Sequence, residues 1–197
     1  MPDEADRVLL VAARRGDNSA ARALLAQIGP LLAAHARTIL RDAALAEDAV
    51  QSALCRLFRL SVGQVKRIES PRAWLSQVVR REALMMVRSH KRAMHRLRRR
   101  ARAEAAVLEA APREEPADLD RLIASLPRRL AEVIVLKHVS NLTFDQIAAA
   151  LSLNRNTAAS RYRAAVARLQ RAVAHEEAGL EPRSPAAHPR AHRGGSL

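Results

Sequence analysis

Residues 142–169 constrain this chain most, because they hold two helical patterns separated by a tight turn. Thr143 and Gln146 have the spacing of a capping box, which marks the first turn of a helix. The apolar side chains that follow at helical spacing are Ile147, Ala148 and Leu151. After a turn at residues 152–153, Asn154 is a good N-cap for a second helix. The segment therefore predicts a helix-turn-helix.

The second helix of this pair is expected to carry polar side chains outward. Its candidate DNA-binding residues are Arg155, Asn156, Thr157, Ser160, Arg161 and Arg163. The residues expected to face inward are Ala158, Ala165, Val166 and Leu169. In a major groove arginine reads guanine and asparagine reads adenine, so the pattern favours recognition of duplex DNA. The alternative is a plain amphipathic hairpin whose charged residues only contact solvent.

The net charge implies a polyanionic partner. Lys plus Arg number 34 against 20 Asp plus Glu, so the formal net charge is +14. A charge of this size and sign points to DNA, RNA or an anionic membrane. Aromatic residues make up only 2% of the chain although 49% of it is hydrophobic. Apolar content dominated by Ala, Leu and Val favours helices over sheets, so the predicted fold class is all-α.

Cysteine usage and the N-terminus indicate the compartment. The single cysteine, Cys55, excludes an internal disulfide and a multi-cysteine zinc site, and we expect it to be a small core residue. Residues 1–10 are acidic and lack the apolar core of a signal peptide. No run approaches the ~18 to 20 apolar residues that span a bilayer. These features predict a soluble, cytoplasmic protein without a cofactor.

The first 60 residues predict helices without visible chemistry. The apolar stripe of the first helix breaks at residues 16–18, where Asn18 or Ser19 is expected to cap the second helix. Pro30 is expected to kink or restart that second helix, because proline removes a backbone donor. Residues 42–60 predict a third amphipathic helix, whose acidic start and basic end complement the helix dipole.

Residues 61–71 break this pattern and are predicted to form a loop with two cations, Lys66 and Arg67. Pro71 then opens a long helix that becomes strongly basic. Its candidate contacts with nucleic acid are Trp74, Arg80, Arg81, Arg88, Lys91 and Arg92. Such a basic face fits phosphate binding. The alternatives are a solvated face, a membrane-surface helix and, for Trp74, a place in the core.

The composition changes again at residues 106–117, which hold prolines and an acidic excess and are expected to form a flexible linker. The linker would divide the chain into domains at residues 1–105 and 118–175. Residues 176–197 lack apolar periodicity and are predicted to be a disordered tail. Two basic surfaces on a short tether suit a protein that touches one duplex at two places. The arginine-rich run at residues 96–102 has no assigned role.

Three motifs in this order resemble the extracytoplasmic-function sigma factors, a small two-domain class of bacterial RNA polymerase sigma subunits in the sigma-70 family. ALAEDAVQSALCRLFRL looks like the polymerase-docking helix of sigma region 2, and PRAWLSQVVRREALMMVRSHKR looks like the promoter-melting helix that follows it. LPRRLAEVIVLKHVSNLTFDQIAAALSLNRNTAASRYRAAVARL resembles the helix-turn-helix domain of sigma region 4. The resemblance therefore covers most of the chain.

The resemblance implies a mechanism of promoter recognition. The residues that would dock on core polymerase are Glu47, Asp48, Gln51 and Leu54. Residues 61–71 would capture a flipped base of the minus-ten element, and helix 71–92 would hold the single non-template strand. Helix 154–169 would read the minus-thirty-five element. The implied partners are core RNA polymerase and promoter DNA, and an anti-sigma protein is a further candidate.

The sequence departs from the family pattern in two places. Ser52 and Ala53 stand where acidic and aromatic residues are common, and Ala158 and Ala159 stand where Val-Lys is common. A helix-turn-helix transcriptional regulator that does not program polymerase therefore remains an alternative. An enzyme acting on nucleic acid is disfavoured, because the sequence shows no paired-carboxylate site, metal-ligand cluster, glycine-rich phosphate loop or nucleophile with a base at motif spacing.

Overall fold

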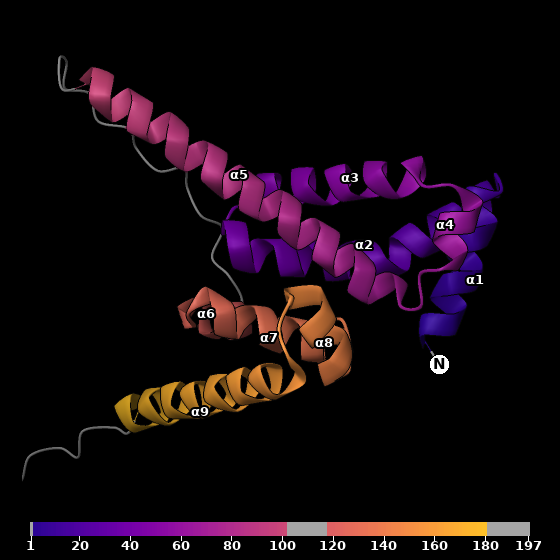
Figure 1. Cartoon of the computed structure of the whole chain (residues 1–197). Helices are drawn as coiled ribbons and strands as arrows, with labels where there is room; N and C mark the ends of the chain where they lie inside the picture. The colour runs from indigo at the N-terminus through magenta and orange to yellow at the C-terminus, as the bar shows by residue number, and fades with distance from the viewer. Residues whose placement is uncertain (1, 102–117, 181–197) are drawn as a thin grey trace, which may run out of the picture.

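The structure is a computed structural model that describes residues 2–101 and 118–180. These residues are all-helical, as predicted (Figure 1). An N-terminal bundle contains α1 (Pro2–Arg14), α2 (Asn18–Leu40), α3 (Ala43–Arg59), α4 (Val62–Lys66) and α5 (Pro71–Ala101). A C-terminal unit contains α6 (Asp118–Ser125), α7 (Arg128–His138), α8 (Phe144–Leu151) and α9 (Arg155–Leu180). The predicted linker at residues 106–117 lies outside the described residues.

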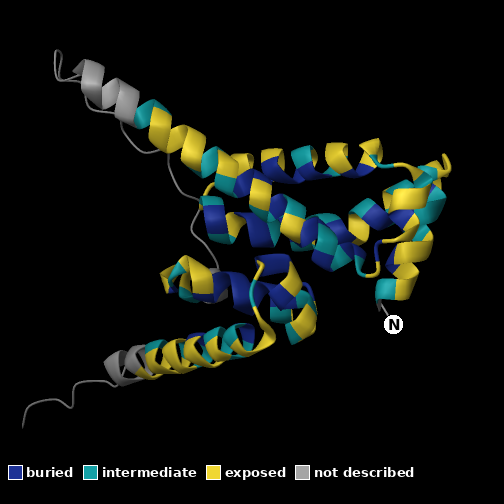
Figure 2. Ribbon diagram, viewed as in Figure 1, coloured by how far each residue is buried: buried dark blue, intermediate teal, exposed yellow. Residues whose placement is uncertain are grey.

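The N-terminal bundle is held together by the apolar faces of α2, α3 and α5, which pack against one another. Its largest fully buried aliphatic side chains include Leu10, Leu24, Ile28, Leu32, Leu57 and Leu75. Figure 2 shows the buried residues along the inner sides of these helices and the exposed residues on their outer sides. Each large aliphatic side chain contributes about 1.5–3 kcal/mol when fully buried. An aliphatic core of this kind needs few aromatic residues.

Helix α2 differs from the prediction at its start and in its character. Its N-cap is Asp17, whose carboxylate accepts hydrogen bonds from the backbone N–H groups of Ser19 and Ala20 at 2.8 and 3.0 Å. The helix continues through Pro30. Helix α2 has 23 residues and holds an 18-residue window with a mean hydropathy of 1.3, so by length and composition alone it could cross a membrane, contrary to the prediction that no such run exists. Seven of its residues are buried, so its apolar face is a core face of the bundle.

The prediction of a loop at residues 61–71 is wrong for its first half, which forms α4. A capping box explains the difference, because the Ser61 hydroxyl accepts from the Gln64 N–H and the Gln64 amide oxygen accepts from the Ser61 N–H. Val65 and Ile68 are buried in the bundle core. The segment therefore has a fixed position, and α4 packs beside α1.

The C-terminal unit is built around α7, which packs against α8 and α9. Its buried apolar residues include Leu130, Val133, Leu136, Ile147, Leu151, Ala158 and Ala165. Thr143 starts α8 with the predicted capping box, and the Asn154 amide oxygen accepts from the Thr157 N–H at 2.7 Å. Ser152 ends α8 in the left-handed conformation, with a φ of 55°. The predicted helix-turn-helix is confirmed.

The structure describes part of the predicted tail. Helix α9 continues to Leu180, so residues 176–180 are helical rather than disordered. Residues 181–197 lie outside the described part of the chain.

The two units pack against each other through two pairs of helices, α2 with α7 and α5 with α8. Figure 1 shows α8 lying next to the N-terminal half of α5. Ala73, in the first turn of α5, is only 7% exposed and belongs to the same apolar cluster as Val133, Leu136 and Ile147 of the C-terminal unit. The domains expected from the sequence are therefore in direct contact in this structure.

Candidate nucleic-acid interface

The outer face of α9 presents the residues predicted to read duplex DNA. Arg155, Asn156, Ser160 and Arg163 are exposed, whereas Thr157 and Arg161 are partly buried. Ala158 and Ala165 are fully buried on the opposite face, as predicted. The first three turns of α9 thus combine a firmly packed inner face with a largely free polar outer face, which is the arrangement that a recognition helix requires.

One interaction engages this outer face. The Arg155 guanidinium lies 3.5 Å from the Asp145 carboxylate, and the two side chains are 65% and 74% exposed. Exposed ion pairs of this kind contribute about 0–1 kcal/mol, so phosphate or base contacts can replace it easily.

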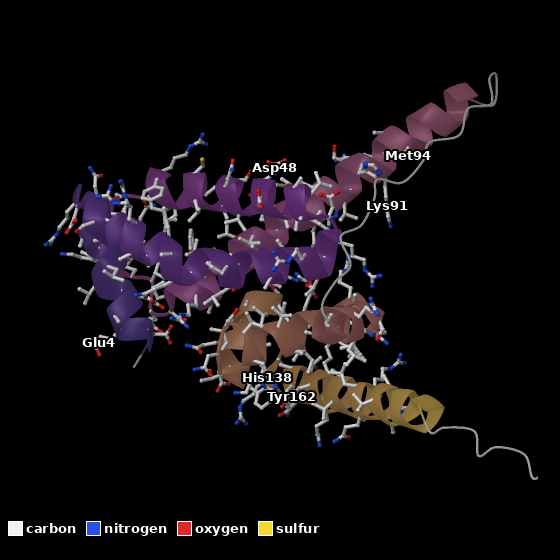
Figure 3. The ribbon with its side chains drawn as sticks, turned by 180° about the vertical axis from the view of Figure 1, so that it is seen from behind. Glu4, Asp48, Lys91, Met94, His138 and Tyr162 are labelled. Carbon is white, nitrogen blue, oxygen red and sulfur yellow. The ribbon has the colours of Figure 1, made fainter. Side chains whose placement is uncertain are left out.

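An aromatic cluster that the sequence analysis missed braces α9 against α7 and α8. Tyr162 of α9 stacks on His138 of α7, with ring centroids 5.6 Å apart, and Phe144 of α8 meets Tyr162 edge-on at 5.5 Å. The Tyr162 hydroxyl also lies 3.1 Å from His138 Nε2 (Figure 3). These residues are distant in sequence, so no local pattern pointed to the cluster. The cluster fixes α9 at its second turn.

The Tyr162→Phe substitution tests this bracing. We expect it to lower the free energy of unfolding by about 0.5–1.5 kcal/mol, because it removes the hydrogen bond to His138 and keeps the ring contacts. Urea unfolding followed by circular dichroism measures the effect. Tyr162→Leu should cost more, since ring stacking adds about 0.5–1.5 kcal/mol per pair. Equal stability of wild type and both variants would show that the cluster does not brace α9.

The basic face predicted on α5 is present over its described side chains. Arg81, Arg88, Lys91 and Arg92 of α5 are exposed, and so are Lys66 and Arg67, which precede α5 in the chain. Trp74 is half-buried and packs against the bundle core. The structure thus supports the alternative core role of Trp74 in part, while one side of the indole borders a surface groove.

That groove lies where α5 meets α8, and its volume is about 550 Å³. Its walls combine four arginines with apolar side chains. The arginines are Arg56, Arg80, Arg81 and Arg88, and the apolar side chains include Trp74, Val78, Leu84 and Met85. Ala150 and Ser152 of the C-terminal unit close one side. Cationic side chains suit the phosphates of a single nucleic acid strand, and flat or apolar side chains suit its bases.

Arg80 differs from the other predicted contacts of α5 because its guanidinium is paired with a buried carboxylate of the C-terminal unit. Its Nε atom lies 3.3 Å from the Glu132 carboxylate of α7, and the Glu132 side chain is only 2% exposed. Burial raises the pKa of the Glu132 carboxyl, and the guanidinium of Arg80 acts in the opposite direction. Arg80 therefore binds the C-terminal unit in this structure.

His35 lies on α2 within the electrostatic reach of Arg80. Its ring is fully buried, and neither ring nitrogen has a hydrogen-bond partner within the described residues. Burial, with a smaller contribution from Arg80, lowers the pKa of His35 to about 3. The ring is therefore neutral in the folded protein at neutral pH.

The predicted docking residues lie along one exposed side of α3. Glu47, Asp48 and Gln51 are exposed, and Leu54 is partly buried; Figure 3 shows Asp48 on the outer side of the helix. A shallow hollow of about 520 Å³ next to them includes Ser52, Cys55, Arg56, Arg59, Glu82 and Met86. Arg56 and Glu82 form an ion pair of 2.8 Å across it.

The prediction that Cys55 is a core residue is wrong, because its side chain is exposed. Position 55 follows the partly buried Leu54 and points to the same side as the exposed Arg56 and Arg59. The core positions of α3 are instead filled by Ala46, Ala49, Ala53 and Leu57. Within the described residues, no group of His, Cys, Asp and Glu could hold a metal ion.

Comparison with known proteins matches both units to one family. A model of Sigma-70 region 2 matches residues 24–93, and a model of Sigma-70, region 4 matches residues 117–169. The fold is similar to the sigma factor RpoE in its complex with the anti-sigma factor NepR from Bartonella quintana. The TM-score is 0.59 and the identity 23%, over 78% of this chain and 96% of that chain. No curated protein matches.

A second solved structure, CnrH in complex with the cytosolic domain of CnrY, gives a TM-score of 0.58. Its identity is 25%, over 87% of this chain and 99% of that chain. Both likenesses extend over the N-terminal bundle and the C-terminal unit together, since each covers more of the chain than either unit contains.

Proposed function

The chain belongs to the sigma-70 family as a sigma factor of the extracytoplasmic-function type, and we propose that the exposed faces of α3, α5 and α9 divide its work between polymerase and promoter. It is a bacterial RNA polymerase sigma subunit, which binds core polymerase, recognises promoter DNA and starts transcription. The observation that carries this conclusion is the presence of both sigma regions in their proper order. A helix-turn-helix regulator that does not program polymerase would not need region 2.

We propose that α9 reads the minus-thirty-five element. The residues assigned to base or phosphate contacts are Arg155, Asn156, Thr157, Ser160, Arg161 and Arg163. The support is that Arg155, Asn156, Ser160 and Arg163 are exposed on the second helix of a helix-turn-helix, opposite the buried Ala158 and Ala165. Thr157 and Arg161 are partly buried on the same helix. Residues near the start of such a helix reach base edges, and later residues reach phosphates.

We propose that α5 and the segment before it hold the minus-ten element as a single strand. The assigned residues are Lys66, Arg67, Trp74, Arg80, Arg81, Arg88, Lys91 and Arg92. The arginines that line the groove would bind phosphates, and the half-buried Trp74 offers one side of its ring to a base. Arg80 would join them after it separates from Glu132.

The α3 face of Glu47, Asp48, Gln51 and Leu54 is proposed to dock on core polymerase. Its exposed acidic and amide groups lie along the helix before a partly buried leucine, and polar groups next to an apolar residue are typical of the rim of a protein interface. Because polymerase and promoter share the cytoplasm in bacteria, we infer a cytoplasmic location. Two similar solved structures hold an anti-sigma protein or a fragment of a partner, and we propose an anti-sigma protein as a third partner.

Co-elution with bacterial core RNA polymerase tests the docking face. The variant Asp48→Ala/Gln51→Ala should weaken binding about tenfold or more, because each truncated contact at the centre of an interface costs ~1 kcal/mol or more. Gln27→Ala, at an exposed position of α2 outside the proposed docking residues, is the control and should bind like wild type. No binding by the wild-type chain at micromolar concentration would contradict the assignment as a sigma subunit.

A further inference from the structure

The ion pair between Asp145 and Arg155 joins the starts of the two helices of the helix-turn-helix. Asp145 lies in the first turn of α8, and Arg155 is the first residue of α9. Oδ2 of Asp145 lies 3.5 Å from Nε of Arg155. Because the two side chains come from different helices, the pair depends on how the tight turn places α8 and α9.

The backbone beneath both side chains is fixed by local interactions. A capping box starts α8, and Asn154 caps α9 through the Thr157 N–H. Between the two helices, Ser152 has a left-handed φ of 55° and closes the tight turn. The helices also share one apolar cluster. Asp145 therefore meets Arg155 at a defined place, although the two side chains are 74% and 65% exposed.

Asp145 is the unusual member of the pair, because it is a carboxylate on a basic surface. Residues 121–174 contain two acidic residues, Glu132 and Asp145, and Glu132 is buried. A carboxylate beside a DNA-binding face repels phosphates and so weakens the general attraction of the protein to DNA. The position of Asp145 therefore favours a role other than phosphate binding.

The helix dipoles explain one part of this arrangement and leave another part open. A carboxylate is stabilising at the start of α8, where Asp145 lies. A cation is disfavoured at the start of α9, where Arg155 lies, and α9 has no acidic residue of its own in the first turn. Asp145 supplies the compensating negative charge from the neighbouring helix, which its place on α8 alone does not require.

The guanidinium of Arg155 keeps one edge for a ligand. A guanidinium presents its N–H donors as a planar fork, and Asp145 lies at the Nε side of that fork. The two terminal nitrogens make no hydrogen bond or ion pair within the described residues. Two parallel N–H donors match O6 and N7 of guanine, which are neutral acceptors. A phosphate is an anion like Asp145 and would compete with it for the same cation.

We propose that Asp145 is a positioning residue that orients the Arg155 guanidinium toward a guanine of the minus-thirty-five element and away from the phosphates. The inference rests on the proposed role of α9 and deepens it, because it names the base that the start of α9 reads. An exposed ion pair is weak in water. In a groove that displaces part of the water, the attraction between the two charges is stronger.

A promoter library tests the inference. Holoenzyme reconstituted with the full chain would transcribe a promoter whose minus-thirty-five element is randomised, and a barcode in each transcript would report the element. The wild-type chain should prefer guanine at one position by about tenfold or more, and Arg155→Ala should lose this preference. Asp145→Ala should weaken the same preference by about threefold or more and leave the preferences at other positions unchanged.

Binding of the same holoenzymes to duplex DNA without a promoter gives a second readout. Asp145→Ala should bind this DNA as tightly as wild type or more tightly, because a negative charge near the phosphates is lost. A role in stability alone would instead weaken binding to both kinds of DNA, and that result would overturn the inference. The matched control, Glu4→Ala, removes an exposed carboxylate of α1 and should change neither readout.

The double variant Asp145→Ala/Arg155→Ala shows whether Asp145 acts through Arg155. If it does, the double variant should have the base preferences of Arg155→Ala alone. A further loss of preference would mean that Asp145 contacts a base itself, and would overturn the inference. A guanine preference that Arg155→Ala loses and Asp145→Ala keeps in full would overturn it too, while the proposed function of α9 would stand. A wild-type holoenzyme without any base preference in this element would contradict both.

Discussion

Replacing Arg155 and Asn156 together by alanine is expected to lower transcription from a promoter with a minus-thirty-five element by about 30-fold or more. Both side chains are exposed in the first turn of α9. Each base contact contributes ~1–3 kcal/mol, and each 1.4 kcal/mol corresponds to a factor of ten. The rate of run-off transcription by the reconstituted holoenzyme measures the effect.

The control for this variant is Arg171→Ala. Arg171 is also an exposed arginine of α9, but it lies four turns beyond the proposed base contacts and is outside the helix-turn-helix. Its loss should reduce activity only through the general electrostatic attraction to DNA, which high salt suppresses. If the double variant loses no more activity than Arg171→Ala, α9 does not read bases through its first turn.

The second large effect concerns stability at mildly acidic pH. The buried ring of His35 has a pKa of about 3 in the folded chain, against an ordinary value of 6.5. Between these values the unfolded chain binds a proton that the folded chain does not, so stability falls as the pH is lowered below 6.5. One such group changes the free energy of unfolding by up to ~1.36 kcal/mol per pH unit, or about 2 kcal/mol between pH 7.5 and 5.

Comparison with His35→Leu isolates this effect. The variant should be at least as stable as wild type at pH 7.5, because both ring nitrogens of His35 lack partners within the described residues. It should then gain about 2 kcal/mol over wild type at pH 5. Glu132 has a raised pKa, which makes stability rise as the pH falls, but it is present in both proteins and its effect cancels in the comparison. Urea unfolding at the two pH values measures the difference, and parallel losses of stability would contradict a buried neutral His35.

Local patterns predicted much of the fold. The capping box at Thr143 and the N-cap at Asn154 place both helices of the helix-turn-helix, because these signals act within one turn of chain. The similar box at Ser61 and Gln64 was overlooked, since Gly63 and Pro71 in the same segment suggested a loop. A helix as short as α4 has too few residues for apolar periodicity, so the capping box is its main sequence signal.

The contacts between distant parts of the chain were not predictable in the same way. Arg72 lies 66 positions from Asp6, and Arg80 lies 52 positions from Glu132. Helical periodicity says which face of a helix is apolar, but it does not say which charged residues of two helices will meet. Arg80 was therefore correctly placed on the basic helix, while its ion pair with the C-terminal unit was not foreseen.

The sequence predicted the exposure of the candidate DNA-binding residues on α5 better than it predicted which residues are buried. Arg81, Arg88, Lys91 and Arg92 are exposed where the basic pattern of α5 put them. The helical pattern does not describe Trp74 fully, because one side of its ring packs against the bundle core and the other side borders the groove.

The most direct test of the central claim is promoter-specific initiation by core polymerase with this chain. Core enzyme, with and without the protein, would transcribe a supercoiled library of bacterial DNA, and the 5′ ends of the transcripts would be mapped. The account predicts new start sites that share two upstream sequence elements and that disappear with the Arg155→Ala/Asn156→Ala and Asp48→Ala/Gln51→Ala variants. Start sites identical to those of core enzyme alone would contradict it.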